Sequence, residues 1–250
     1  MTPIWTSLVV FACVFGGALL GMALRGFLPQ HHLSPDSKDV VKVGIGLVGT
    51  MAALVLGLMV ASAKGSYDTQ KSELIHMSAG IVALDRMLAH YGPETKEARE
   101  RLRVAVTRVL DQIWPEDRSQ PSLAPRGAGG EVLYDKLGEL NPKDDKQRSL
   151  QAQALSAAID LARTRWLMFE QSGSAISTPF LVVVVFWLTI IFVSFGIFAP
   201  PNTTVAATLF ICALSVSAAI FLILEMDKPF EGLIQISSAP LRAALTHLGQ

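Results

Sequence analysis

Few side chains in this sequence have the types and the spacing that chemistry requires. The clearest group is Glu225, Asp227 and Lys228, which come together where a long apolar run ends. An ionisable residue at the edge of a membrane span is a functional candidate. Glu225 also lies three residues before Lys228, so a local or intersubunit ion pair explains it equally well. Both interpretations stay open at this point.

Other combinations that catalysis or metal binding would need are missing from the sequence. His31 and His32 are adjacent and cannot share one helix face, and no carboxylate or cysteine spacing completes a metal set. We interpret them as part of a solvated loop. The sequence contains no Gly-x-Ser-x-Gly elbow and no phosphate-binding glycine loop. The sequence therefore predicts that the protein is not an enzyme and that it binds no metal ion and no cofactor. Cys13 and Cys212 each fall inside an apolar run, which indicates no disulfide.

The elements that dominate the chain are apolar runs of membrane length. Of the 250 residues, 51% are hydrophobic, and 21 basic side chains balance 21 acidic ones. A helix needs about 20 apolar residues to cross a bilayer, and the runs that qualify are 4–24, 43–63, 179–199 and 203–224. The predicted fold class is all-α, a membrane protein with four transmembrane helices in the lipid bilayer. Balanced charge without a basic block argues against a nucleic-acid partner.

The four spans predict a division of the chain into four parts. Residues 1–63 and 179–224 are transmembrane hairpins, 64–178 is a helical cytoplasmic bundle with a mobile loop at 115–130, and 225–250 is a cytoplasmic tail. Near the spans, the side that holds the middle segment and both termini carries more Lys and Arg than the opposite side. The positive-inside rule therefore places both termini and the middle segment in the cytoplasm.

The second span carries two stripes of residues. One stripe is small throughout, which lets helix backbones approach closely in lipid. It consists of Gly49, Ala53, Gly57, Ala61 and Gly65. The neighbouring stripe is polar at both ends and apolar in the middle. It consists of Thr50, Leu54, Leu58 and Ser62. A ring of such helices would surround a pore with a hydrophobic constriction that gates by dewetting. Ordinary packing inside a four-helix bundle explains the same residues.

The same helix is predicted to continue beyond the membrane, because no proline interrupts it before Pro93. Apolar residues then recur at spacings of three and four, which indicates one buried seam. They are Leu74, Met77, Ile81, Leu84, Leu88 and Tyr91. A membrane helix should thus run directly into the helical bundle if Gly65 and Gly80 do not break it. The pair Asn141-Pro142 predicts the start of another long helix, which ends near Gln171.

Three segments resemble a family of bacterial membrane proteins known as the bestrophin-like domain family. The segments are residues 84–94, which read Leu-Asp-Arg through Tyr-Gly-Pro-Glu, residues 187–200 and the tail at 225–245. The resemblance extends over nearly the whole chain. The residues that it singles out as family motifs are Tyr67, Asp68, Glu225, Asp227 and Pro229.

The layout is also similar to that of bacterial bestrophins, in which a small residue, Tyr and Asp follow the second span. Ser66, Tyr67 and Asp68 occupy that place, although the expected basic and aromatic residues do not follow them. The resemblance implies a homo-oligomer, a pentamer, in the bacterial inner membrane, with an axial pore lined by the second span. Such a pore would pass small monovalent inorganic ions passively, with anions favoured over cations. Calcium gating is not implied, because the acidic calcium-binding run of animal bestrophins has no counterpart.

The predicted function is accordingly an oligomeric ion channel. The alternative is a non-conducting membrane scaffold or sensor whose cytoplasmic helical bundle binds a protein partner. A secondary transporter is disfavoured, because no span is broken by Gly or Pro pairs at mid-membrane and no inverted repeat is visible. Assembly separates the first two hypotheses: a ring with an axial cavity favours the channel, and a monomer or dimer favours the scaffold.

Overall fold

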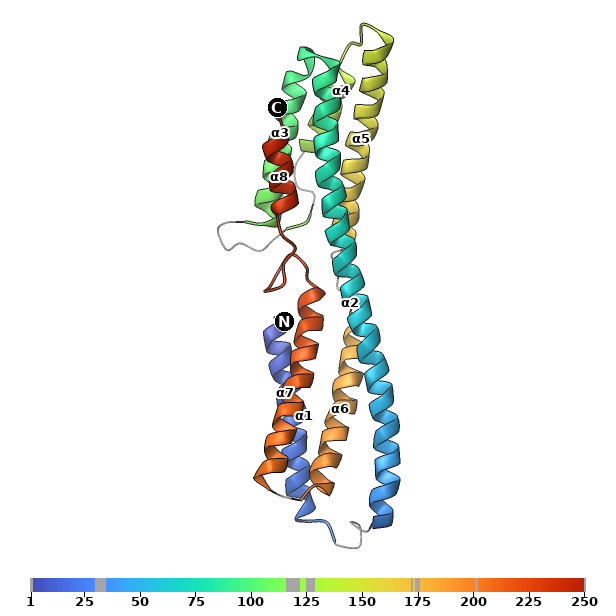
Figure 1. The fold of residues 1–250 in the computed structure, drawn as a ribbon, viewed down its shortest axis with the longest axis vertical. Helices are drawn as coiled ribbons and strands as arrows, with labels where there is room; N and C mark the ends of the chain where they lie inside the picture. The colour runs from blue at the N-terminus through green and yellow to red at the C-terminus, as the bar shows by residue number, and fades with distance from the viewer. Residues whose placement is uncertain are drawn as a thin grey trace. The chain divides into compact units, whose positions relative to one another are not determined.

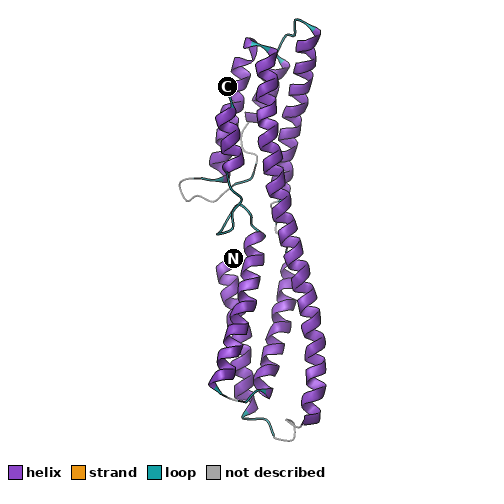
Figure 2. Ribbon diagram, viewed as in Figure 1, coloured by secondary structure: helices purple, strands orange, loops and turns teal. Residues whose placement is uncertain are grey.

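The computed structural model describes residues 2–29, 35–115, 122–124, 129–171, 173, 176–200 and 202–249, and the regular structure within these ranges is helical, without strands (Figure 2). Most of the predicted loop at 115–130 and the pair His31 and His32 lie outside the described residues. The elements in chain order (Figure 1) are α1 (Pro3–Arg25), α2 (Pro35–Tyr91), η2 (Pro93–Thr95), α3 (Lys96–Ile113), α4 (Gly129–Gly138), α5 (Asp145–Glu170), α6 (Thr178–Phe198), α7 (Thr203–Met226) and α8 (Ala239–His247).

Four of these helices, α1, α2, α6 and α7, are long and apolar enough to cross a membrane. They contain the predicted spans, except that α6 ends at Phe198, one residue before the predicted end of the third span. The all-α class and the four apolar helices are therefore confirmed. The helix α2 is a single helix of 57 residues, and neither Gly65 nor Gly80 interrupts it. From the end of the apolar run to Tyr91, α2 is therefore regular helix throughout, as the sequence predicted.

The chain divides into two compact units. Unit 1 consists of Met1–Ser66 and Ser174–Asp227, and unit 2 consists of Tyr67–Gly173 and Lys228–Gln250. The helix α2 contributes its first part to unit 1 and its second part to unit 2, and the residues after Asp227 belong to unit 2.

Unit 1 is built around α1, which packs against both α6 and α7 (Figure 1). Its core contains Val14, Val184 and Ile220, none of which is exposed. Several hydroxyl groups in this unit donate to a carbonyl oxygen one turn earlier in their own helix, as Thr189 does to Val185 at 2.7 Å, and backbone partners of this kind satisfy polar groups in lipid. One hydroxyl group reaches another helix: Ser217 Oγ on α7 donates a hydrogen bond to the carbonyl oxygen of Ser7 on α1 at 2.5 Å.

The closest helix contact in unit 1 is between α1 and α6. A side chain at Gly21 would overlap the carbonyl oxygen of Val193, and a side chain at Gly196 would overlap the carbonyl oxygen of Ala18. Small residues make such a close approach of two backbones possible. The sequence pattern predicted packing of small residues in the second span only, and the pair of Gly21 and Gly196 was not predicted. The available signal was the run rich in Gly and Ala at residues 16–21.

We expect Gly21→Ala to destabilise unit 1 by about 1–3 kcal/mol, the usual cost of overpacking. The added methyl group meets a backbone oxygen, which cannot move away unless the two helices separate. Thermal unfolding of the purified protein in detergent measures the loss. Gly16→Ala is the matched control, because a Cβ atom there meets nothing within 4 Å. Equal unfolding temperatures for the two variants would contradict the close crossing.

Unit 2 has the second part of α2 at its centre. The six residues of the predicted seam are buried, none more than 5% exposed, and they pack with buried residues of α3, α4, α5 and α8. The seam is therefore confirmed. Trp114, at the end of α3, holds the C-terminal segment: its Nε1 donates to the carbonyl oxygen of Ile236 at 3.0 Å, and its ring packs edge-on against Phe230.

The predicted start of the helix after Asn141-Pro142 is wrong by a few residues. The helix α5 begins at Asp145, because Asp144 is its N-cap and accepts a hydrogen bond from the backbone amide of Gln147 at 2.6 Å. A capping aspartate satisfies an amide that the first helical turn leaves unpaired. The end at Glu170 agrees with the predicted end near Gln171.

Candidate functional site

The predicted pore stripe lies on an uncovered face of α2. Leu54 and Leu58 are 66% and 70% exposed, and Thr50 and Ser62 are exposed as well. The Thr50 hydroxyl donates to the carbonyl oxygen of Gly46 at 2.8 Å, so its hydrogen is used within the helix. The opposite face of α2, with Ala52, Met59 and Ala63, is buried in unit 1. Within one chain, the stripe therefore faces away from the core of unit 1.

The predicted small-residue stripe lies on the same uncovered side. Ala53 and Ala61 are exposed, and a Cβ atom at Gly57 or Gly65 would meet no atom within 4 Å. At Gly49 it would reach only Ile191 Cδ1, at 3.9 Å. No described helix of the same chain thus packs closely on this stripe, and close packing there would need another molecule. Contact with a second copy stays a prediction.

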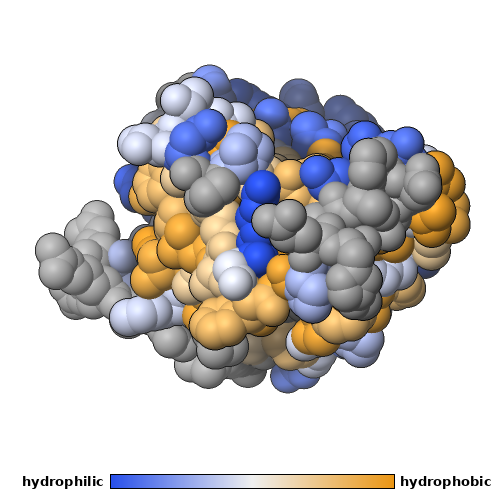
Figure 3. Space-filling model, turned by 90° about the horizontal axis from the view of Figure 1, so that it is seen from below, coloured by the Kyte–Doolittle hydropathy of each residue, from blue (hydrophilic) through white to orange (hydrophobic). Residues whose placement is uncertain are grey.

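The surface of unit 1 as a whole is apolar. The large side chains of Phe186 and Ile211, for example, are 60% and 62% exposed. Hydrophobic residues also cover much of the described surface seen from the end at which α6 joins α7 (Figure 3). A soluble monomer rarely exposes so large an apolar area. These apolar surfaces are suited to contact with lipid hydrocarbon or with another copy of the chain.

The carboxylates that follow the fourth span are buried in unit 1. Glu225 is 2% exposed and Asp227 is 5% exposed, and neither is without an interaction. Asp227 Oδ1 accepts a hydrogen bond from the backbone amide of Ile176 at 3.2 Å. Lys228, the ion-pair partner considered for Glu225, lies 3.4 Å from a carboxylate oxygen of Glu231. Asp227 therefore has a structural role, because it fixes the segment before α6.

The other family-motif residues lie in unit 2. Tyr67 is partly buried against the core of that unit, and Asp68 is exposed. Pro229 is buried, and its carbonyl oxygen accepts a hydrogen bond from the amide of Ile236 at 2.7 Å. That hydrogen bond closes the turn before α8. Tyr67 and Asp68 thus belong to the part of α2 that lies in unit 2, and Pro229 belongs to the segment before α8.

A buried ion pair that the sequence analysis did not identify joins three parts of unit 2. Asp85, on the seam helix α2, accepts two hydrogen bonds from Arg99 on α3, from Nε at 2.7 Å and from Nη2 at 2.8 Å. Its Oδ2 also accepts from the backbone amide of Gly249 at 3.3 Å. The Asp85 side chain is 2% exposed and that of Arg99 is 23% exposed. This two-pronged arrangement is the strongest geometry between a guanidinium and a carboxylate.

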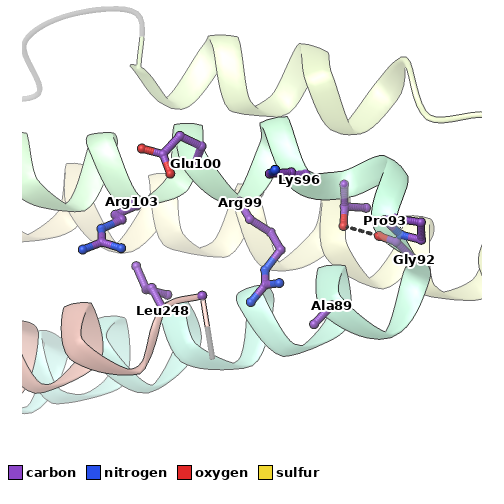
Figure 4. Close-up of a pocket in the computed structure, with 10 residues that line it drawn as sticks. Ala89, Gly92, Pro93, Lys96, Arg99, Glu100, Arg103 and Leu248 are labelled. Carbon is purple, nitrogen blue, oxygen red and sulfur yellow. Dashed lines mark hydrogen bonds between the residues drawn. The ribbon is translucent and has the colours of Figure 1, made fainter.

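The environment of Asp85 sets its charge. Burial alone raises the pKa of the Asp85 carboxyl group, but the hydrogen bonds from Arg99 and Gly249, with the positive charges of Arg99 and Arg86, together hold that pKa below its usual value. Asp85 is therefore ionised at neutral pH. A hollow of about 470 Å³ lies beside the pair, and Lys96, Arg99 and Arg103 project from α3 along it (Figure 4).

A second cavity, of about 500 Å³, opens at the surface of unit 2 between α2, α3, α4 and α5, and the exposed side chains of Ile159 and Trp166 lie on its wall. Most of its wall is apolar, but Arg165 of α5 also lines it and is only 8% exposed. Burial lowers the pKa of the Arg165 guanidinium to about 10, so the group is still charged at neutral pH. Nothing in the sequence distinguishes Arg165 from the exposed Arg163 two residues earlier, so its burial could not be predicted.

Among the residues that the structure describes, no three His, Cys, Asp or Glu side chains lie close enough to hold a metal ion. Comparison with known proteins gives one family: a model of the Bestrophin-like domain matches residues 12–241. No curated protein and no solved structure matches the chain. The matched range includes α2, α6 and α7 in full and α1 from its tenth residue onward. It also includes the buried pair of Asp85 and Arg99 and the cavity beside Arg165.

Proposed function

The chain belongs to the Bestrophin-like domain family, and from that premise we propose that it is an oligomeric ion channel whose axial pore is lined by α2. Its family and its four long apolar helices make it a multi-pass membrane protein. The proposal concerns what the membrane helices do once several copies assemble.

The observation that carries the proposal is the uneven coverage of the four spans. In α1, α6 and α7, 28% of the residues in the apolar stretch are buried within the chain, but in α2 only 11% are. The uncovered side of α2 contains both the small-residue stripe and the neighbouring stripe of Leu54 and Leu58. A helix at the centre of a ring would present such a surface, with glycines toward its neighbours and the second stripe toward the axis.

The proposed gate is the apolar part of that second stripe. Leu54 and Leu58 lie one helical turn apart, with Thr50 one turn before them and Ser62 one turn after them. Rings of leucine would form a narrow apolar neck, which excludes ions when it dewets. The polar residues at both ends would keep the pore hydrated on either side of the neck.

The family suggests the remaining features of the proposal. The assembly is a homo-pentamer in the bacterial inner membrane, and it passes small monovalent ions passively, anions in preference to cations. The distribution of Lys and Arg supports a cytoplasmic position for the middle segment and both termini. The helix α2 belongs to both units, so it is the element through which a change in unit 2 would reach the pore.

Replacement of a neck residue tests the pore assignment. We expect Leu54→Ala or Leu58→Ala to increase single-channel conductance several-fold in planar bilayers, because a wider and less apolar neck stays hydrated. Ile211→Ala is the matched control, since Ile211 is an equally exposed apolar residue on α7. Unchanged currents in both α2 variants would remove Leu54 and Leu58 from the conduction path.

Direct imaging of the purified complex tests the assembly. The channel requires a ring with an axial opening bounded by α2. A ring in which Leu54 and Leu58 face the surrounding lipid, or protomers that stand alone, would contradict the channel and favour the scaffold or sensor.

A further inference from the structure

The cavity in unit 2 has the size and the lining of a small-molecule site. Its volume of about 500 Å³ falls within the roughly 300–1,000 Å³ that is usual for such sites. The wall includes apolar side chains from each of the helices that surround it, among them Met77 of α2, Val106 of α3, Leu133 of α4 and Leu161 of α5. Most of the surface that a ligand would touch is therefore hydrocarbon.

The deeply buried charge at this cavity, that of Arg165, forms no ion pair with a described residue. Arg165 is 8% exposed, and its Nη1 atom is buried without a hydrogen-bond partner in the part of the chain that the structure describes. Its Nη2 atom lies 3.4 Å from Oε1 of Gln112, which is a long contact with a neutral group. A buried charge is costly unless it is paired. The Nη1 group of Arg165 would therefore be stabilised by a hydrogen-bond acceptor that the described chain does not supply.

The charges around the cavity restrict what that acceptor is. Arg108 and Arg165 contribute two positive charges to the lining, and Glu131 and Asp135 contribute two negative charges. The lining is thus neutral overall, so it disfavours a phosphate with two charges and tolerates a ligand with one. A carboxylate has a single charge, and its planar pair of oxygens fits the planar guanidinium.

We propose that this cavity binds a monocarboxylate with an apolar tail of medium length, with the carboxylate on the guanidinium of Arg165 and the tail against the apolar wall. The ligand class is that of a fatty acid. Trp166, which is 57% exposed, also lines the cavity, so part of a bound tail would lie against its ring. The site lies entirely within unit 2 and does not depend on whether the chain conducts ions.

The proposal is tested with decanoate as the probe and the full chain in phosphatidylcholine nanodiscs. Isothermal titration, with the heat of protein-free discs subtracted, separates binding from partition into lipid. We expect saturable binding that Arg165→Met weakens by roughly 10- to 100-fold, which is the value of a hydrogen bond to a charged group. Arg163→Met is the matched control, because Arg163 is an exposed arginine on the same helix, and it should bind decanoate like the wild type.

Two further measurements separate the proposed site from general adhesion of amphiphiles. Decanol has the same chain without the charge, so it should bind the wild type as weakly as decanoate binds Arg165→Met. Should Arg165→Met fail to fold, Ala158→Phe adds a ring at a partly buried position of the cavity wall and leaves the guanidinium in place, and loss of decanoate binding in that variant supports the proposal. The proposal is overturned if the wild type shows no saturable binding, if decanol equals decanoate, or if neither variant weakens binding.

Discussion

Gly57→Leu is expected to abolish the oligomer and to leave the fold of the single chain intact. A Cβ atom at Gly57 meets no atom of its own chain within 4 Å, so the larger side chain has room in the isolated protomer. In a ring of closely packed α2 helices it would not, because small residues are what let two backbones approach in lipid. Leucine is also the better helix former. The size of the assembly, measured by light scattering or native mass spectrometry in detergent, reports the effect.

Two controls make this result specific to the stripe. Gly57→Ala adds only a methyl group, as Ala53 and Ala61 already do within the same stripe, and should keep the oligomer. Gly44→Leu places the same leucine at a glycine of α2 that lies outside the stripe and is equally free of contacts. An oligomer of normal size in Gly57→Leu would show that the stripe faces lipid or the pore lumen and not a neighbouring subunit.

The features that the sequence predicted correctly are those that depend on one helix at a time. The length of an apolar run fixes a span, and the spacing of Leu74, Leu84 and Leu88 fixes the buried side of α2. Neither requires knowledge of the partner. The start of α5 was missed by a few residues, because both Pro142 and Asp144 are starting signals and only the observed hydrogen bond selects Asp144.

The features that could not be predicted depend on which residues meet across the fold. Gly21 contacts the backbone of α6 more than 170 positions later, and Asp85 contacts the amide of Gly249 at a separation of 164. In the sequence, Arg165 resembles the other arginines of the middle segment. Only the packing of the helices around it shows that it is buried. In each case the residue type was visible, but only the tertiary arrangement gives it a role.

The second large effect is expected at the buried ion pair. Asp85→Asn should destabilise unit 2 by about 3–5 kcal/mol, because removal of one partner leaves the other charge without its counter-ion. Arg99 is 23% exposed and water compensates it in part, so we expect a value near the lower limit. Hydrogen exchange measures the change locally: amides of α3 and α8 should exchange roughly 100-fold faster, as 1.4 kcal/mol corresponds to a factor of ten. Asp111→Asn, at an exposed carboxylate of α3, should change little.

The dependence on pH follows from the direction of the pKa shift. The pKa of Asp85 is lower in the folded protein than in an unfolded chain, so its contribution is fully present above the ordinary pKa of aspartate, about 4. It is lost as the pH falls below that value toward the folded pKa. The wild type should therefore lose stability in acid more steeply than Asp85→Asn, which has no proton to gain at this position. Parallel acid-unfolding curves would contradict the assignment.

Removal of both partners distinguishes the ion pair from packing alone. If the cost of Asp85→Asn comes from an uncompensated charge on Arg99, then replacement of both residues by apolar ones of similar shape should recover much of the loss. Asp85→Leu with Arg99→Met is the variant that tests this, and its amides in α3 should exchange more slowly than those of Asp85→Leu alone. The amide of Gly249 would still lose its acceptor at Oδ2 of Asp85, so protection near the C-terminus should not return. A double variant as unstable in α3 as the single one would mean that Asp85 acts through shape and not through charge.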